Sequence, residues 1–236
     1  MASEQSGQPP AGEPGERAER RYRGLLLDYG GVLTTSVFDA FGEFCAQEGL
    51  AREALERSLR SDRRCRELLI ALETGRLAEE RFESRLAQIL DVPARDLIAR
   101  MFAGARPDRV MAATVRAARE AGIPTGLVSN SWGTRRYDRA LLEELFDAVL
   151  ISGEVGVRKP APEIYRLAAE RIGVPPRACV FVDDLPFNLK PAAELGMATV
   201  HHVCTERTVA GLSQLLGLDL SRGSSARTPA SPTAPP

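Results

Sequence analysis

Polar residues that could carry out chemistry follow three short apolar runs of the sequence, and a lysine lies between two of these runs. The residues are Asp28, Ser129, Asn130, Lys159, Asp183 and Asp184. Short apolar runs bounded by polar or glycine residues are typical of buried parallel strands, whose carboxyl ends meet at one edge of a sheet. We therefore expect three carboxylates, a lysine, a hydroxyl and an amide to lie close together.

This set of groups suits phosphoryl transfer. An aspartate can attack phosphorus and form an aspartyl-phosphate. Because the nucleophile and the phosphate are both anionic, their repulsion must be offset, and Mg²⁺ held by one or two carboxylates does this. Lys159 can neutralise further charge, and Ser129 with the backbone N–H groups after it can hold phosphate oxygens. Each residue alone has a simpler interpretation, as a cap, a turn or a surface lysine. Only their joint placement supports a catalytic site.

The elements that must position these residues alternate between strand and helix. The expected strands are Leu25–Leu27, Gly126–Ser129, Ala148–Ser152, Cys179–Val182 and Thr199–Val203. Segments with helical periodicity separate the later strands; one of them places Met111, Val115 and Ala118 on a single face. This alternation predicts an α/β fold with a doubly wound parallel sheet.

One long segment, residues 36–106, shows only helix signals. An all-helical insert directly after the first strand would lie over the carboxyl end of that strand. We therefore predict a helical cap over 36–106 that moves relative to the sheet domain, which comprises 23–35 and 107–217. The terminal segments, 1–22 and 218–236, lack hydrophobic periodicity and are predicted to be disordered tails.

The composition restricts the possible partners and the cellular location. The chain has 236 residues, a formal net charge of −1 and 44% hydrophobic residues. These values give no reason to expect a nucleic acid or a membrane as partner. The four cysteines form no CxxC pair, and the N-terminus has no apolar signal core. We expect reduced thiols and a cytoplasmic protein that acts on a small-molecule phosphate substrate, with its oligomeric state left open.

Four segments of the sequence resemble the motifs of the haloacid dehalogenase superfamily. They read DYGGVL, SNSW, GVRKPAPEIY and VDDLPFNLKPAAELGM. The resemblance covers 23–217 and is strongest to the phosphatase-like domain at the N-terminus of soluble epoxide hydrolases. It implies a Rossmann-like core with a class I helical cap and a Mg²⁺ cofactor.

The resemblance also implies a role for each site residue. Asp28 is the nucleophile, and Asp28, the backbone carbonyl of Gly30 and Asp184 bind Mg²⁺ directly. Asp183 supports catalysis without direct contact with the metal. Ser129 and Asn130 bind phosphate, and Lys159 is the basic residue of the third motif.

One residue departs from the pattern of this superfamily. Its phosphatases usually carry a second aspartate two residues after the nucleophile, as general acid and then base, whereas this sequence has Gly30. Loss of a general acid typically costs on the order of 100- to 10,000-fold in rate. Alkyl phosphates should suffer most, and aryl or acyl phosphates least, because their leaving groups need little protonation. Restoring an aspartate at position 30 is expected to help, unless a positive φ or the cap prevents it.

Gly30 keeps two other functions open. Dehalogenase relatives also lack the second aspartate and need no metal, but their fourth motif has no aspartate pair like Asp183-Asp184. A catalytically weak binding or regulatory protein with the same fold is the other alternative.

Two further features of the sequence have more than one interpretation. Trp132 could line the substrate pocket or pack against the cap. Six arginines lie between positions 52 and 66, and because acids are interleaved with them we interpret them as a solvated helix face.

Overall fold

The computed structural model describes residues 20–221 and contains a five-stranded parallel sheet. The strands are β1 (Gly24–Leu27), β2 (Thr125–Ser129), β3 (Ala148–Ile151), β4 (Cys179–Asp183) and β5 (Ala198–His201), in the order β3-β2-β1-β4-β5. The predicted parallel sheet is therefore confirmed, with strand ends that differ from the prediction by at most two residues. One difference is that Ser152 begins a helix instead of ending β3.

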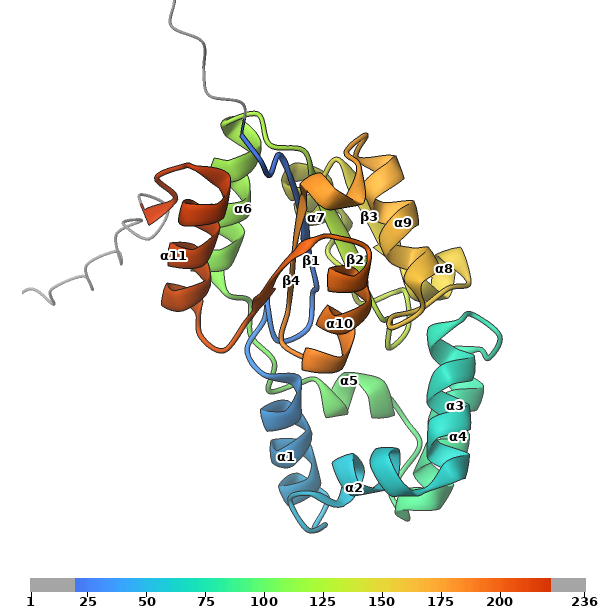
Figure 1. Ribbon diagram of the computed structural model, residues 1–236. Helices are drawn as coiled ribbons and strands as arrows, with labels where there is room; N and C mark the ends of the chain where they lie inside the picture. Colours follow the sequence, from blue (N-terminus) through green and yellow to red (C-terminus); the bar gives the residue numbers. More distant parts are fainter. Residues whose placement is uncertain (1–19, 222–236) are drawn as a thin grey trace, which may run out of the picture.

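Helices cover both faces of the sheet, as a doubly wound fold requires (Figure 1). One face is covered by α6 (Arg109–Glu120) and α11 (Thr205–Leu216), with α7 (Arg139–Leu145) beside α6. The other face is covered by α9 (Pro162–Arg171) and α10 (Pro186–Glu194). The short helices α8 (Ser152–Val155) and η1 (Pro176–Ala178) complete the connections.

Helix α6 shows how the local sequence determines where a helix begins and which face it buries. The Asp108 carboxylate accepts hydrogen bonds from the backbone N–H groups of Val110 and Met111, at 2.9 and 2.8 Å, and so caps the helix. The predicted apolar face, which includes Met111 and Val115, is fully buried against the sheet.

Residues 37–101 form five helices that pack around a separate hydrophobic core below the carboxyl ends of the strands (Figure 1). They are α1 (Val37–Gln47), α2 (Ala54–Ser61), α3 (Arg63–Glu73), α4 (Glu79–Leu90) and α5 (Leu97–Met101). Two linkers join this cap to the sheet domain and pair with each other. The Thr35 N–H donates to the Arg106 carbonyl at 2.8 Å, and the Asp108 N–H donates to the Leu33 carbonyl at 2.8 Å. Because the two linkers run side by side, they form a single connection about which the cap could rotate.

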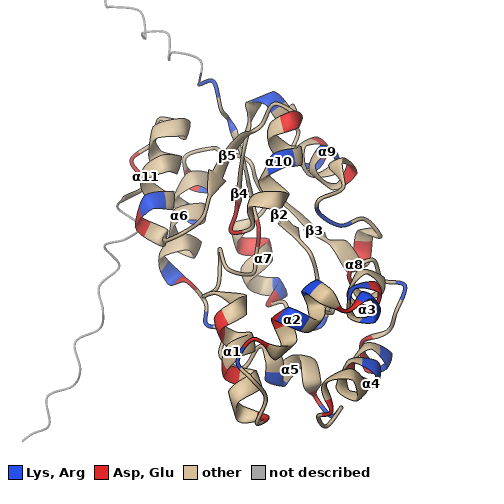
Figure 2. Ribbon diagram, turned by 60° about the horizontal axis from the view of Figure 1, so that its bottom comes forward, with Lys and Arg blue, Asp and Glu red and all other residues tan. Residues whose placement is uncertain are grey.

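The arginines of α2 and α3 are mostly paired with acids at the surface. Figure 2 shows basic and acidic residues interleaved along these helices. Arg63 pairs with Glu67 and Arg64 with Asp62, with arginine side chains that are 84% and 74% exposed. Exposed pairs of this kind fit the predicted solvated face. They contribute little to the stability of the fold.

The predicted tails lie mostly outside the described residues, but the C-terminal limit of the sheet domain needs correction. Leu220 is 1% exposed and packs into the core cluster that contains Leu212 and Leu216. The packed chain therefore extends past the predicted boundary at residue 217. A single leucine after a helix shows no periodicity, so no sequence pattern marked it. Within the described part of the chain, no helix is long and apolar enough to cross a membrane.

Candidate active site

The strand ends bring the predicted carboxylates together. Asp28 follows β1, and its N–H donates to the Val182 carbonyl of β4 at 2.9 Å, so the two strands place Asp28 beside Asp183. Asp28, Asp183 and Asp184 each offer a carboxylate oxygen within 4.8 Å of the others. In Figure 2 the ribbon has the red colour of acidic residues where β4 ends. The convergence expected from the sequence is present.

Lys159 lies between two of these carboxylates and is fully buried. Its ammonium nitrogen Nζ is 2.8 Å from Asp28 Oδ1 and 2.7 Å from Asp183 Oδ2. Burial by itself lowers the pKa of Lys159, but the charges of Asp183 and Asp28 outweigh it, so the net shift is upward. Lys159 is therefore a permanent cation that holds the Asp28 carboxylate in place.

The Asn130 side chain contacts the backbone of Lys159, and its predicted contact with phosphate stays a prediction. Its Oδ1 accepts from the Lys159 N–H at 2.8 Å, and its Nδ2 donates to the Lys159 carbonyl at 3.0 Å. Both polar groups of the amide thus contact the backbone of one residue, and a second N–H of Nδ2 is not used in these bonds. A sequence pattern could not show this pairing, because it joins residues 29 positions apart.

Asp183 and Asp184 have different surroundings despite being adjacent. Asp183 Oδ1 accepts from the Leu185 N–H at 2.9 Å and from Asn188 Nδ2 at 3.0 Å, and its Oδ2 accepts from Lys159. Asp184 Oδ1, in contrast, is buried and has no hydrogen-bond partner among residues 20–221. A buried carboxylate oxygen without a partner is costly, so a ligand is expected there.

The local charges favour a cation at this position. Burial raises the pKa of Asp28 to about 8; the Lys159 charge opposes this shift, and the charges of Asp183 and Asp184 add to it. Burial and the Asp183 charge likewise raise the pKa of Asp184 to about 6. Three carboxylates therefore face one lysine, and a hard divalent cation such as Mg²⁺ fits an oxygen donor set of this kind.

Ser129 is buried at the end of β2, and its Oγ is 2.8 Å from the Tyr137 hydroxyl. Tyr137 fixes the orientation of this hydroxyl beside Asp28. Burial raises the pKa of Tyr137 well above its usual range, so its O–H stays protonated. The sequence analysis missed Tyr137, because a tyrosine in a loop carries no motif.

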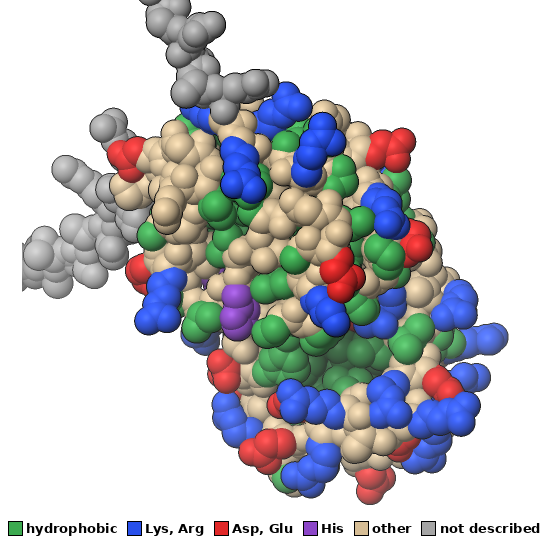
Figure 3. All heavy atoms as spheres, viewed as in Figure 1, with side chains coloured by type: hydrophobic (Ala, Val, Ile, Leu, Met, Phe, Trp, Pro, Cys, Tyr) green, Lys and Arg blue, Asp and Glu red, His purple; other side chains and the backbone are tan. Residues whose placement is uncertain are grey.

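A cavity of about 540 Å³ extends from Asp28 into the space between the cap and the sheet domain. Its walls combine charged side chains with aromatic rings, which include Phe38, Phe41, Phe102, Trp132 and Phe187. Figure 3 shows the hydrophobic hollow between the two parts, with basic side chains along its cap-side rim. Both interpretations of Trp132 hold, since the ring lines the cavity and also packs edge-to-face against Phe41, Phe82 and Phe102. Arg60 of α2 also lines the cavity and is thus more than part of a solvated face.

A buried ion pair joins the cap to the active-site loop. Glu73, the last residue of α3, has a side chain that is 4% exposed, and its Oε2 lies 2.5 Å from Arg158 Nε. Arg158 immediately precedes Lys159, and both Glu73 and Arg158 line the cavity. Nothing in the sequence connected these residues, which come from the cap and from the loop after α8.

The family model of haloacid dehalogenase-like hydrolases matches residues 22–196, which is most of the chain. This chain is a haloacid dehalogenase-like hydrolase. The family expected from the motifs is therefore confirmed, together with the Rossmann-like core.

Curated relatives of this hydrolase include both phosphatases and larger enzymes. The bifunctional epoxide hydrolase 2 of Sus scrofa is 33% identical over 106 residues, which are 42% of this chain and 19% of that protein. The fructose-1-phosphate phosphatase YqaB of Escherichia coli is 32% identical over 133 residues, or 55% of this chain and 63% of that protein. The chain thus spans less than a fifth of the length of the epoxide hydrolases it matches.

Solved structures share the fold at lower identity. A predicted hydrolase of this family from Porphyromonas gingivalis matches with a TM-score of 0.66 and 20% identity, covering 83% of this chain and 98% of that one. An enzyme of the family from Bacteroides thetaiotaomicron, in complex with magnesium and inorganic phosphate, matches with a TM-score of 0.57 and 22% identity. That match covers 76% of this chain and 93% of the other. A dehalogenase matches equally well, with a TM-score of 0.57 and 22% identity over 75% of this chain and 83% of that one.

Gly30 stands where phosphatases of the family usually have an acid, and the structure shows what fills that space. A Cβ atom on Gly30 would lie 2.9 Å from Val37 Cγ2, at the start of α1. Gly31, and not Gly30, has a positive φ, of 76°. The obstacle to an aspartate at position 30 is therefore the cap side chain Val37 and not the backbone conformation.

Replacing Lys159 by methionine should destabilise this hydrolase strongly. The change leaves the buried Asp28 and Asp183 without their cation, and breaking a buried pair in this way costs about 3 kcal/mol or more. Urea unfolding in metal-free buffer measures the loss in the free energy of unfolding. Lys190, the other lysine of the chain, is exposed, so Lys190→Met is the matched control and should change little. Equal stability of the two variants would contradict this account of the buried lysine.

Proposed function

We propose that this chain is a Mg²⁺-dependent phosphatase that hydrolyses a small phosphate ester through an aspartyl-phosphate on Asp28. The observation that carries the proposal is the cluster of the Asp28, Asp183 and Asp184 carboxylates at a cavity, with one buried oxygen of Asp184 that has no partner among the described residues. Phosphatases among the relatives support it, and so does the magnesium and phosphate complex of an enzyme with the same fold.

Each proposed residue has a distinct task. Asp28 attacks phosphorus, and Lys159 holds its carboxylate and offsets the charge of the incoming phosphate. Asp28, the carbonyl of Gly30 and Asp184 are the proposed metal ligands; when bound, Mg²⁺ supplies positive charge to the transferring phosphoryl group. Asp183 fixes Lys159 and the turn after β4. Ser129, oriented by Tyr137, and Asn130 bind phosphate oxygens, and Asn130 also positions Lys159.

The cavity bears on the kind of substrate. The aromatic rings of the cavity wall offer a leaving group apolar contact. We propose a phosphate ester with an apolar portion, in place of a heavily hydroxylated sugar phosphate. A nucleic acid or membrane partner is not proposed, and the cytoplasmic location remains a prediction from the sequence.

A turnover assay tests this function against its two alternatives. We expect multiple-turnover release of inorganic phosphate from some members of a phosphate ester panel when Mg²⁺ is present, and none in EDTA. Halide release from 2-haloacids that persists in EDTA would instead identify a dehalogenase. Failure to turn over any ester or haloacid would leave the binding-protein alternative, for which Gly30 is the motivating residue.

Metal binding should depend on Asp184 and on Gly31 beneath it. A Cβ on Gly31 would overlap the Asp184 carboxylate, and its φ of 76° also disfavours a side chain. Calorimetry should show weaker Mg²⁺ binding for Asp184→Ala, and for Gly31→Ala a loss on the order of 10- to 100-fold. Gly122→Ala is the matched control, because Gly122 has a φ of 80° and no neighbour within 4 Å. Unchanged Mg²⁺ affinity in Asp184→Ala would place the metal elsewhere.

A further inference from the structure

The proposed phosphatase lacks a general acid at position 30, yet a carboxyl group reaches its cavity from the cap. We propose that Glu73 is the general acid that protonates the leaving group and then the base that activates water. This inference rests on the proposed phosphatase function and adds to it the residue that supplies the proton. It also assigns a chemical role to the cap.

Glu73 is held against the sheet domain and not in solvent. The turn after it contains Gly75, whose position directly against the Gly153 carbonyl of α8 leaves no room for a side chain. The end of α3 is therefore docked on the loop that leads to Arg158. Glu73 contacts Arg158 at 2.5 Å, and the next residue, Lys159, contacts Asp28 at 2.8 Å. Two adjacent residues thus link Glu73 to the nucleophile, and all four line one cavity.

The surroundings of Glu73 allow it to carry a proton near neutral pH. Burial raises the pKa of Glu73 to about 7, although the charges of Arg158 and Lys159 oppose the shift. The other charged side chains that line the cavity are Asp28, Glu56, Arg60, Arg136 and Asp184. A bound phosphate adds negative charge and competes for Arg158, and both effects favour the protonated form of Glu73. A general acid works best with a pKa near the working pH.

The other proton donors of the cavity fit this task less well. The Tyr137 hydroxyl is engaged with Ser129, and burial raises its pKa far above neutrality. Burial also raises the pKa of Tyr29. Glu56 is paired with Arg60 at 2.8 Å, and its side chain is 31% exposed, so it is held at the solvent-facing part of the cavity wall.

The proposed proton transfers balance over one turnover. As Asp28 forms its bond to phosphorus, the bond from phosphorus to the leaving oxygen breaks, and that oxygen takes the electron pair and the proton of Glu73. The Glu73 carboxylate then accepts a proton from the water that attacks the aspartyl-phosphate. This second attack breaks the bond between phosphorus and the Asp28 oxygen, so both carboxyl groups return to their starting states. Because Glu73 belongs to the cap, the acid is in place only when the cap is closed.

The test compares leaving groups in Glu73→Gln and wild-type protein with Mg²⁺. Glutamine is similar in size and can occupy the same place beside Arg158, but it cannot transfer a proton. We expect about a 100-fold loss of kcat/KM on alkyl phosphates and a loss of less than about 3-fold on 4-nitrophenyl phosphate. On alkyl phosphates, wild-type activity should fall as pH rises through about 7, where Glu73 loses its proton, and the variant should lack this fall.

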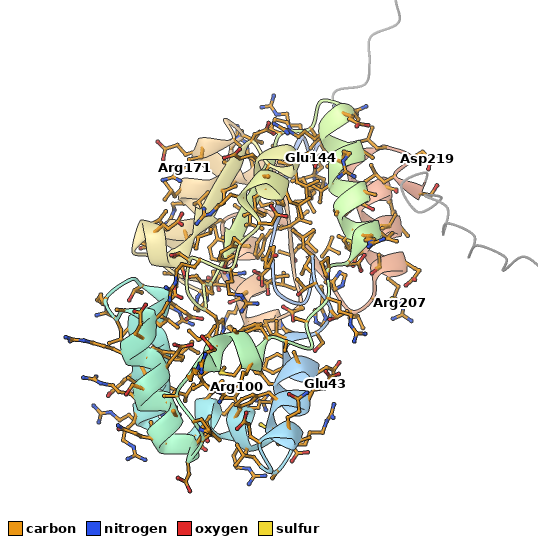
Figure 4. All side chains as sticks on the ribbon, turned by 180° about the vertical axis from the view of Figure 1, so that it is seen from behind. Glu43, Arg100, Glu144, Arg171, Arg207 and Asp219 are labelled. Carbon is orange, nitrogen blue, oxygen red and sulfur yellow. The ribbon has the colours of Figure 1, made fainter. Side chains whose placement is uncertain are left out.

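A matched control separates proton transfer from damage to the cap. Glu48 is also a cap glutamate paired with an arginine, at 3.0 Å from Arg100, and neither residue lines the cavity. Arg100 is labelled on α5 in Figure 4. Glu48→Gln should leave the ratio of alkyl to aryl rates unchanged. Should Glu73→Gln fail to fold, Glu73→Asp retains a carboxylic acid and is expected to keep the fall in rate above pH 7.

The possible outcomes distinguish the two proposals. A loss in Glu73→Gln that is equal for alkyl and aryl phosphates would overturn the assignment of Glu73 as the acid and leave it a positioning residue. A dependence on leaving group that appears in Glu56→Gln instead would also overturn it. In both cases the wild type still releases phosphate, so the phosphatase function stands. Absence of phosphate release from every ester by the wild-type protein would overturn both proposals.

Discussion

Replacement of Asp28 by asparagine is expected to abolish phosphate release from every ester while leaving the protein folded. Asparagine has nearly the same shape but cannot form an acyl phosphate, and loss of a covalent nucleophile costs on the order of 10,000-fold or more in kcat. Single-turnover assays with radiolabelled substrate measure the remaining chemistry. They should also show phosphate covalently bound to the wild-type protein and none on the variant.

The stability of this variant separates a lost nucleophile from a lost fold. Without metal, Asp28 is one of three carboxylates around Lys159, and its pKa is raised to about 8. Removing its charge relieves repulsion, and the Asn oxygen can still accept from Lys159 and from the Tyr29 N–H, which donates to Asp28 Oδ1 at 2.7 Å. The melting temperature in EDTA should therefore stay equal or rise. Asp39, on the exposed face of α1, provides the control Asp39→Asn. A variant of Asp28 that keeps most of its activity would show that another residue is the nucleophile.

The parts of the site that the sequence predicted are those that strand topology dictates. Asp28, Ser129 and Asp183 stand at or directly after the ends of β1, β2 and β4, and parallel pairing of these strands brings them to one edge. The apolar runs identify such strands without any knowledge of tertiary contacts. Lys159 comes from a loop beside that edge, so the strand pattern does not place it; its sequence motif assigned it to the site.

The parts that the sequence could not predict depend on contacts between elements. The Asn130 amide holds Lys159, Tyr137 holds Ser129, and Glu73 reaches Arg158 across the boundary between cap and sheet domain. Each of these contacts joins loops or helix ends, where no periodicity indicates which way a side chain points. The same limit explains why Gly30 was suspected of a positive φ that belongs to its neighbour Gly31.

Restoring an aspartate at position 30 should raise the rate on alkyl phosphates, provided that Val37 is reduced in size. The backbone of Gly30 lies outside the left-handed region, so it accepts a side chain, but a Cβ would lie 2.9 Å from Val37 Cγ2. Valine is stiff and sits at the start of α1, so it cannot easily rotate away. We expect little gain from Gly30→Asp alone. Gly30→Asp combined with Val37→Ala, in the Glu73→Gln background, should gain about 10-fold or more on alkyl phosphates and little on aryl phosphates. Val37→Ala alone is the control.

The double change Gly30→Asp with Val37→Ala, made in both the wild type and Glu73→Gln, tests whether the new aspartate and Glu73 supply the same proton. If they do, the gain should be large in Glu73→Gln and smaller in the wild type, because the wild type already has an acid; such non-additivity is expected of groups that share one task. Equal gains of about 10-fold in both backgrounds would show that Glu73 transfers no proton, while leaving the phosphatase function intact. A folded, Mg²⁺-binding triple variant that remains inert towards every phosphate ester would count against the phosphatase function itself. Kinetics with one alkyl and one aryl phosphate, measured for the two backgrounds with and without the double change, are sufficient to decide among these outcomes.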